Sequence, residues 1–467
     1  MERIASASRR RRAAIGLGLL AALAAASCTD GDASASDGGT ATAALSGITG
    51  SAATISQPPV PGQIPIAPES ERVDLAVPTF SNPTEITNPL FPVSRQRSVL
   101  FLGHVDGKPF RTEVTLLPFT RVVRWEGRTV QTAVSQYNAF LGGQIEEVAY
   151  DLYAQADDGS VWYFGEDVFD FRDGAIISTE GTWQAGRDGP AAMIMPADPQ
   201  VGDVYRTENA PGFVFEEVTV RSTDETLDGP LGPIEGGMLA DELHNDGKTE
   251  QKEFAPGYGE FYTAGGGDVE ALALAVPTDA TTEPLPAGLT TMWSGALDVF
   301  DAAADGDWSG AAASSDKVRS AWRAFPVGDV PVLIEPRVDA AVRALDAAVA
   351  GRGAREAQDA AIEAARLSLD LQLRYRPTSE VDLARLDLWA AQLTADAAAN
   401  DAAAVSADSF AMDYVRDRLL GALDQEQLLA VNTELGAIQV AVIDREIGKA
   451  AAAARRLRDE IRAFPSG

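Results

Sequence analysis

Short apolar runs separated by tight turns make up residues 82–276. The runs are rich in Val, Ile, Phe, Tyr and Trp, and they recur about every 8–14 residues without a helical period between them. The clearest hairpin joins 145–154 to 161–164 through Asp158-Gly159, a dipeptide that favours a tight turn. The pattern predicts an antiparallel β meander that curls into a half-barrel or a sandwich.

From 288 to 465 the pattern changes to a helical period, and Ala, Leu and Asp dominate. Helix-ending motifs recur around Gly306, Gly351, Asn400 and Arg445, at spacings of 45, 49 and 45 residues. Each motif is typical of the tip of an αα-hairpin, so we expect four hairpins that form an all-α helical-hairpin domain. The chain is therefore predicted to be an α+β multidomain protein, with separate cores in its two parts.

The N-terminus has the pattern of a secretory signal. A basic stretch, 9–12, precedes an apolar core, 13–26, and Cys28 follows directly as the single cysteine of the chain. We expect residues 1–27 to be a signal peptide and Cys28 to be lipidated, which anchors the protein to the outside of a bacterial cell membrane. The alternatives are ordinary cleavage after Ala26, which would give a secreted protein with a free thiol, and export by the twin-arginine route.

Residues 28–80 have the composition of a tether. Their first part consists almost entirely of Ala, Ser, Thr, Gly and Asp, and a proline-rich part follows. Such a segment buries too little apolar surface to offset the entropy of ordering. We expect a disordered spacer that holds the folded part away from the membrane.

The charge of the chain excludes one class of partner. Its 38 Lys and Arg face 69 Asp and Glu, a net charge of −31, and removal of residues 1–27 with their five arginines and one glutamate would leave −35. A chain this acidic repels nucleic acid, so no nucleic-acid partner is expected. The acidity is typical of a soluble exported protein, and cation binding is the alternative interpretation.

Catalytic motifs are missing from the sequence. Once Cys28 is assigned to lipid, no thiol remains for disulfides or catalysis, and His104 and His244 are the two histidines of the chain. The sequence contains no Gly-x-Ser-x-Gly elbow, no His-Glu-x-x-His, no phosphate loop and no dinucleotide fingerprint. We therefore predict no catalytic residue, cofactor or metal ligand, and the sequence favours a protein that is not an enzyme.

Four motifs occur in order along about 190 residues of the β part. They are 88–92 (NPLFP), 150–155 (YDLYAQ) with 159–167 (GSVWYFGED), 182–186 (TWQAG) with 195–196 (MP), and 254–259 (FAPGYG). Together they resemble segments of a group of exported bacterial β-rich proteins of unknown function. The resemblance implies the fold and no site, and 238–244 lacks a cysteine that some relatives have. Residues 370–398 are similar to helical segments of other uncharacterised exported bacterial proteins.

A candidate ligand site lies on the aromatic hairpin and the segment after it. Aromatic and sulfur side chains there would surround an apolar cavity, with a carboxylate at its mouth. The residues are Tyr153, Trp162, Trp183 and Met193, with Glu166 or Asp167 at the mouth. The alternative interpretation is ordinary packing of a β core, since aromatic cross-strand pairs stabilise sheets.

A second candidate lies at the end of a predicted helix, where Arg374, Tyr375 and Arg376 precede Pro377. Two arginines and a tyrosine among many acids are unusual in this half and would suit contact with an anion or a protein partner. The alternative is a helix C-terminus that the cations stabilise through the helix dipole.

Three functions remain open after these observations. The first is a non-catalytic binding or scaffolding role in the cell envelope, for a small apolar ligand or a protein partner, and it requires an enclosed apolar cavity in the β part. The second is a hydrolase, which requires two loop carboxylates that converge in a cleft. The third is a divalent-cation-binding surface protein, which requires clustered oxygen ligands.

Overall fold

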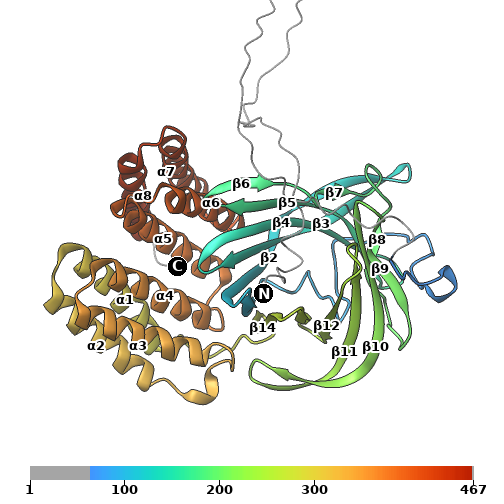
Figure 1. Cartoon of the computed structure of the whole chain (residues 1–467), viewed down its shortest axis with the longest axis horizontal. Coiled ribbons are helices and arrows are strands. Elements are labelled where there is room, and N and C mark those ends of the chain that lie inside the picture. Colours follow the sequence, from blue (N-terminus) through green and yellow to red (C-terminus); the bar gives the residue numbers. More distant parts are fainter. Residues whose placement is uncertain (1–63, 465–467) are drawn as a thin grey trace, which may run out of the picture.

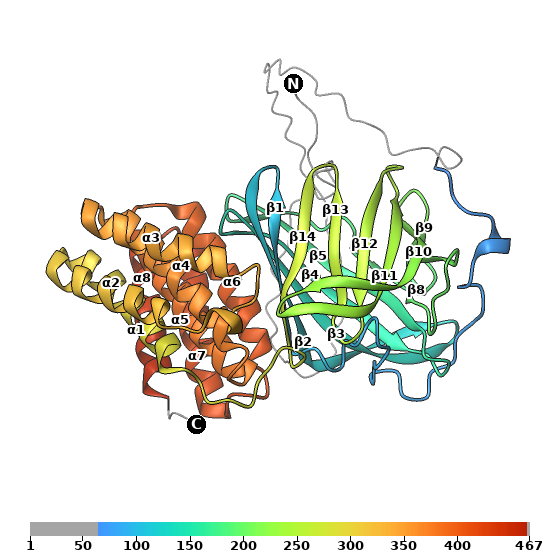
Figure 2. The same ribbon diagram turned by 90° about the horizontal axis from the view of Figure 1, so that it is seen from below.

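The computed structural model describes residues 64–464, in which a curved β-sheet and a helical part lie side by side (Figures 1 and 2). The strands are β1 (Ser98–Val105), β2 (Lys108–Trp125), β3 (Arg128–Leu141), β4 (Gln144–Gln155), β5 (Val161–Arg172), β6 (Ala175–Ser178), β7 (Trp183–Gln184), β8 (Ala192–Met195), β9 (Val204–Ala210), β10 (Val214–Gly229), β11 (Gly232–His244), β12 (Thr249–Ala255), β13 (Gly259–Gly265) and β14 (Asp268–Val276).

All the strands belong to one antiparallel sheet of 14 strands with the order β6-β5-β4-β3-β2-β1-β14-β13-β12-β11-β10-β9, and the short strands β7 and β8 pair with β5. Strand β1 pairs with β14, which places Ser98 opposite Val276 in the middle of the sheet. We refer to β2–β6 as the first arm and to β9–β13 as the second arm. The predicted antiparallel meander is confirmed, and it takes the form of a single open, curled sheet.

Tight turns set the register of several hairpins. At Asp106-Gly107 and Asp173-Gly174 both residues have positive φ, with values between 50° and 71°. Two successive positive φ values are the signature of the type I′ turn, whose twist matches that of the flanking strands. The Asp-Gly pairs that mark turns in the sequence therefore join β1 to β2 and β5 to β6.

The helices are α1 (Ala287–Asp305), α2 (Trp308–Arg323), α3 (Glu335–Gly351), α4 (Ala354–Gln372), α5 (Thr378–Ala398), α6 (Ala402–Arg418), α7 (Gln425–Ile443) and α8 (Ile447–Ala463), with short 3₁₀ turns η2 (Glu69–Glu71) and η3 (Val327–Asp329). The four hairpins expected from the repeated motifs are present, because Gly306, Arg352, Asn400 and Arg445 adopt left-handed backbone at the hairpin tips. Among the described residues, no helix combines the length and apolarity needed to cross a membrane.

The sheet and the helices share their cores, which differs from the expected separation. Phe140 of β3 stacks on Trp389 of α5 with ring centroids 5.5 Å apart. Leu100 of β1 and Leu274 of β14 are buried in the same cluster as residues of α1 and α4. One face of the sheet is apolar enough to require a cover, and the helices supply it.

A buried ionic network fastens the sheet to the helices at this junction. It joins β2, α4, α5 and α6 through three arginines and three carboxylates: Arg111, Glu113, Asp370, Asp382, Arg385 and Arg418. The Arg111 guanidinium donates to both oxygens of Asp370 at 2.6 and 2.7 Å, and Arg418 donates to Glu113 at 2.6 Å. The charges balance within the network.

The segment before β1 also lies against the sheet. The backbone N–H of Val73 donates to the carbonyl of Val204 at 2.9 Å, and the Asp74 carboxylate accepts from the backbone N–H of Arg206 at 3.0 Å. Residues 64–80 were expected to belong to the disordered tether, and these bonds to β9 explain why they are ordered instead. Residues 1–63, including Cys28, lie outside the described residues.

Candidate functional site

The two faces of the sheet have different chemistry. Along β2, Arg111 and Glu113 point to the helices, where they meet Asp370 and Arg418. Thr112 between them points to the opposite side, since side chains alternate along a strand. The two arms of the sheet curl toward this opposite side, which we refer to as the inner face (Figure 2).

Carboxylates gather on the inner face. Residues directly opposite each other on paired strands share a face, as Asp151 and Glu166 do on β4 and β5, and Glu242 and Glu250 do on β11 and β12. The arms also meet across the inner face, through the short strand β7 that pairs with β5 of the first arm. Trp183 Nε1 of β7 donates to Glu208 Oε1 of β9 at 3.2 Å. The carboxylates assigned to this face are Asp151, Glu166, Glu208, Glu216, Glu242, Glu250, Glu260 and Glu270.

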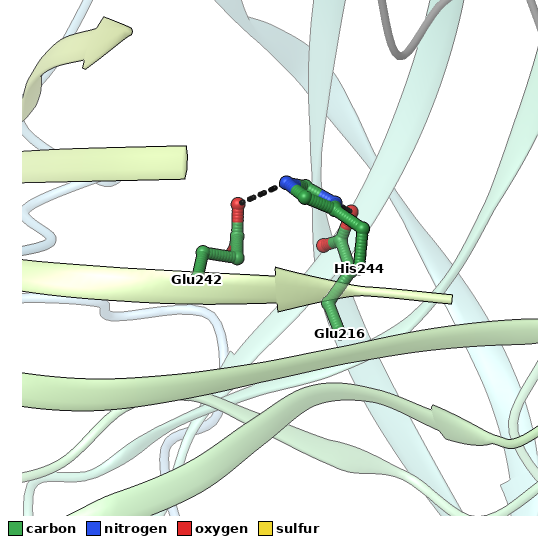
Figure 3. Close-up of side chains that lie close together, drawn as sticks. All are labelled: Glu216, Glu242 and His244. Atoms are coloured by element: carbon green, nitrogen blue, oxygen red, sulfur yellow. Dashed lines mark hydrogen bonds and ion pairs between the residues drawn. The ribbon is translucent and has the colours of Figure 1, made fainter. Parts of the chain in front are cut away.

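His244 lies among these carboxylates, at the end of β11 (Figure 3). Its Nδ1 is 3.1 Å from Glu216 Oε1, and its Nε2 is 3.7 Å from Glu242 Oε2 and 3.5 Å from Glu250 Oε2. His244 lies directly opposite Glu216 in the β10–β11 pairing and two residues after Glu242 on its own strand. Strand pairing and strand period together therefore turn all three side chains to one point.

The ligand atoms of Glu216, Glu242 and His244 all lie within 4.8 Å of one another. One imidazole nitrogen and two or three carboxylate oxygens form a ligand set that suits Zn²⁺ or Mn²⁺. A nearby cation already shares one of these ligands, because Lys252 Nζ lies 3.4 Å from Glu242 Oε2 and 2.8 Å from Glu260 Oε1. We refer to the three residues Glu216, Glu242 and His244 as the His244 cluster.

The protonation of His244 follows from its neighbours. Burial by itself would lower its pKa, but hydrogen bonds to Glu216 and Glu250 and the surrounding negative charge raise the pKa to about 11. The same contact with His244 lowers the pKa of Glu250. In the absence of a metal ion the imidazole is therefore a cation that the carboxylates hold in place, and a metal ion that binds a nitrogen of His244 must displace a proton from the ring.

A buried hydroxyl without a partner lies beside the cluster. Tyr205 on β9 is 0% exposed, and among the described residues no hydrogen-bond partner reaches its hydroxyl group. Tyr205 is opposite Val218, which is opposite Glu242, so the three share the inner face. Burial raises the pKa of the Tyr205 hydroxyl above its usual value, and the negative charge of Glu242 adds to this rise. A buried polar group left without a partner is costly, which is typical of a place that accepts a ligand or water.

The structure brings together only part of the predicted aromatic site. The Tyr153 ring stacks on Tyr163 with centroids 4.9 Å apart, and Tyr163 meets Trp183 edge-on at 5.4 Å. These rings lie on the inner face with Glu166. The sequence prediction missed Tyr163, whose hydroxyl donates to Asp151 Oδ1 at 2.7 Å.

The other predicted members lie elsewhere. Trp162 is opposite Ala154, on the other face of the hairpin from Tyr153, and it neighbours Met193 of β8 in the main hydrophobic core. Asp167 forms an ion pair with Arg121, away from the inner face. The six candidates therefore do not line a single cavity, because strand alternation separates them into two groups.

The second predicted site is occupied by contacts within the chain. Arg374 Nε donates to the carbonyl of Asp279 at 3.0 Å, and its guanidinium lies over the Tyr375 ring at 5.7 Å. Arg376 donates to Gln372 at 2.9 Å and to Glu380 at 3.0 Å. These bonds close the end of α4 against the start of α5 and the segment after β14.

No family model matches the sequence, and no curated protein is detectably similar to it. We therefore infer function from the side chains of the inner face.

Asp151 gives the inner face a measurable pH dependence. Burial raises its pKa to about 7, the charge of Glu260 adds to the rise, and the hydrogen bond from Tyr163 opposes it. A carboxyl with a raised pKa in the folded state stabilises the fold below its ordinary pKa near 4, and that contribution is lost as the pH rises through about 7. Asp151→Asn should therefore leave stability unchanged at pH 4 and raise it by roughly 1–3 kcal/mol at pH 8.

Urea unfolding at both pH values measures this difference, and Asp198→Asn at an exposed turn is the matched control. Equal stability of the Asp151→Asn variant and the wild type at pH 8 would show that Asp151 ionises without cost.

Proposed function

We propose that the protein is a non-catalytic binding protein of the bacterial cell envelope, and that it binds a divalent cation through Glu216, Glu242 and His244. The convergence of the three ligand atoms within 4.8 Å carries the proposal. The proposal thus takes up the divalent-cation alternative drawn from the sequence and assigns these three residues to it.

The chemistry of the inner face favours a cation over a small apolar ligand. An apolar ligand placed there would remove water from carboxylates and give them no new partner, which is costly. A cation instead gives these carboxylates a partner of opposite charge. Asp151 and Glu270 both have pKa values raised to about 7, chiefly by burial and further by the charge of Glu260, and a cation bound nearby would favour the ionised form of both carboxyls.

The proposal includes the location expected from the N-terminal sequence. A lipid on Cys28 and a spacer after it would hold the sheet outside the membrane. The resemblance to exported bacterial β-rich proteins expected from the sequence motifs would imply the same location.

Titration with Mn²⁺ or Zn²⁺ by calorimetry tests the site. The wild type should bind one ion, and His244→Ala should weaken binding by roughly 100-fold because it removes the one nitrogen ligand. The matched control is His104→Ala, since His104 is the other histidine of the chain and lies exposed on β1. Glu242→Gln should weaken binding as well.

Two outcomes would reject the cation site. One is a wild type that binds neither ion at millimolar concentration. The other is equal binding by the His244→Ala and His104→Ala variants, which would place the ion on other carboxylates.

A further inference from the structure

A small cavity lies on the helix side of the sheet, away from the inner face. It has a volume of about 70 Å³ and lies where β2 and β3 meet α3, α4 and α5. A water molecule needs roughly 10–15 Å³ of such space, so the cavity has room for several waters or one small molecule. We refer to it as the junction cavity. Its lining includes Arg111, Arg337, Arg366, Phe140, Trp389 and Glu363.

Two of the three arginines have carboxylate partners. Arg111 is bonded to Asp370 and Glu113, at 2.6 and 2.7 Å. Arg366 donates to Glu363 at 2.7 Å and to the side-chain oxygen of Gln392 at 3.1 Å. Each of these guanidinium groups still has further N–H donors, because arginine has five.

Arg337 of α3 differs from the other two. Its guanidinium donates to the carbonyl of Gly103 at 3.1 Å and forms no ion pair with another residue of 64–464. Burial lowers the pKa of Arg337, and the positive charge of Arg111 lowers it further. The negative charges of Glu363 and Asp370 oppose this shift without cancelling it. Arginine nevertheless remains charged in proteins. A half-buried positive charge without a carboxylate partner therefore faces this cavity.

Aromatic rings form another wall. Phe140 and Trp389 stack with centroids 5.5 Å apart and an angle of 25° between the rings, and the Arg366 guanidinium lies over the Trp389 ring at 5.5 Å. A small apolar group can pack on such rings while an attached anionic group meets arginine. The two carboxylates that line the cavity are engaged, Glu363 by Arg366 and Glu113 by Arg418 at 2.6 Å.

We propose that the junction cavity binds a small anion, whose carboxylate or oxyanion group accepts hydrogen bonds from Arg337 and Arg366. Carboxylate and phosphate groups share the paired oxygens that suit the fork of a guanidinium group. The site lies between the sheet and the helices, so an anion bound there contacts both parts of the chain. The proposal is independent of the cation site, since the sheet separates the two.

Calorimetric titration with two probes tests the proposal on the full chain. Inorganic phosphate represents a free oxyanion, and acetate represents a small carboxylate with an apolar group. At least one probe should bind the wild type with one equivalent, and Arg337→Met should weaken that binding at least about tenfold. The matched control is Arg343→Met on the same helix, whose side chain is 72% exposed and which should bind as the wild type does.

The pattern of results identifies the anion. Binding of acetate alone would assign the site to a carboxylate, and binding of phosphate alone would assign it to an oxyanion without an apolar group. Both outcomes support the proposal. Failure of both probes to bind the wild type, or unchanged binding by Arg337→Met, would overturn it. Circular dichroism checks the fold of each variant. If Arg337→Met does not fold, Arg337→Lys takes its place. That variant retains the charge without the guanidinium fork, so unchanged binding by it would also overturn the proposal.

Discussion

Glu113→Ala should lower the free energy of unfolding by about 3–5 kcal/mol, because it removes one partner from a buried set of charges. Glu113 accepts hydrogen bonds from Arg111 and Arg418, and Arg385 lies 3.6 Å away. These contacts hold the pKa of Glu113 well below its usual value in spite of burial. Without Glu113, three arginines would face two carboxylates at a site where the Arg385 and Arg418 side chains are 3% and 0% exposed.

Denaturant unfolding followed by circular dichroism measures this loss. The control is Asp167→Ala, which breaks the ion pair with Arg121 on the surface, where both side chains are more than a third exposed. A surface pair contributes about 0–1 kcal/mol, so that variant should unfold almost as the wild type does. If the two variants lose similar amounts of stability, the network at the junction does not hold the sheet to the helices.

Trp162→Ala should have a loss of similar size, about 3–5 kcal/mol, because it leaves a large cavity in the core. The Trp162 side chain is 4% exposed and lies in the main hydrophobic cluster, and its Nε1 donates to Ser160 Oγ at 2.9 Å. Trp162→Phe retains most of the ring contacts and should lose much less stability. Thermal and urea unfolding of the two variants measures the difference.

Phe213→Ala is the matched control for this aromatic truncation, since Phe213 is among the exposed large apolar residues. If Trp162→Ala lowers the free energy of unfolding by less than about 1 kcal/mol, Trp162 is not a core residue and is again a candidate for ligand binding.

Much of the fold could be predicted because it depends on local signals. The Asp-Gly turns, the alternation along 145–164 and the spacing of the helix tips are all short-range features, and the structure confirms the hairpins that they indicate. The pairing of β1 with β14 has no such signal. The ionic network has no short-range signal in the sequence either, because Arg111 and its partner Asp370 are 259 residues apart. Arg111 and Glu113 alternate with Thr112 in a way that resembles an exposed strand face.

The candidate sites show the same limit. Glu242 and His244 are two residues apart in a strand, so the sequence alone places them on one face. Glu216 joins them through the register of β10 and β11, which the sequence does not specify. The predicted aromatic site grouped Tyr153 with Trp162 by composition, although strand alternation separates them. The residue types suggested one site on the hairpin, but the side chains point to opposite faces of the sheet and do not form it.

The meeting of β1 and β14 in the middle of the sheet bears on how the chain assembles during synthesis. Each arm consists mainly of neighbouring hairpins, which close small loops and pair quickly. Strand β1 can pair early with β2, but its other edge stays open until β14 emerges near the end of the sheet. An unpaired edge with apolar side chains such as Leu100 and Leu102 is prone to aggregate. Because α1 begins soon after β14, the strand that closes the sheet and the first helix that covers it emerge from the ribosome almost together.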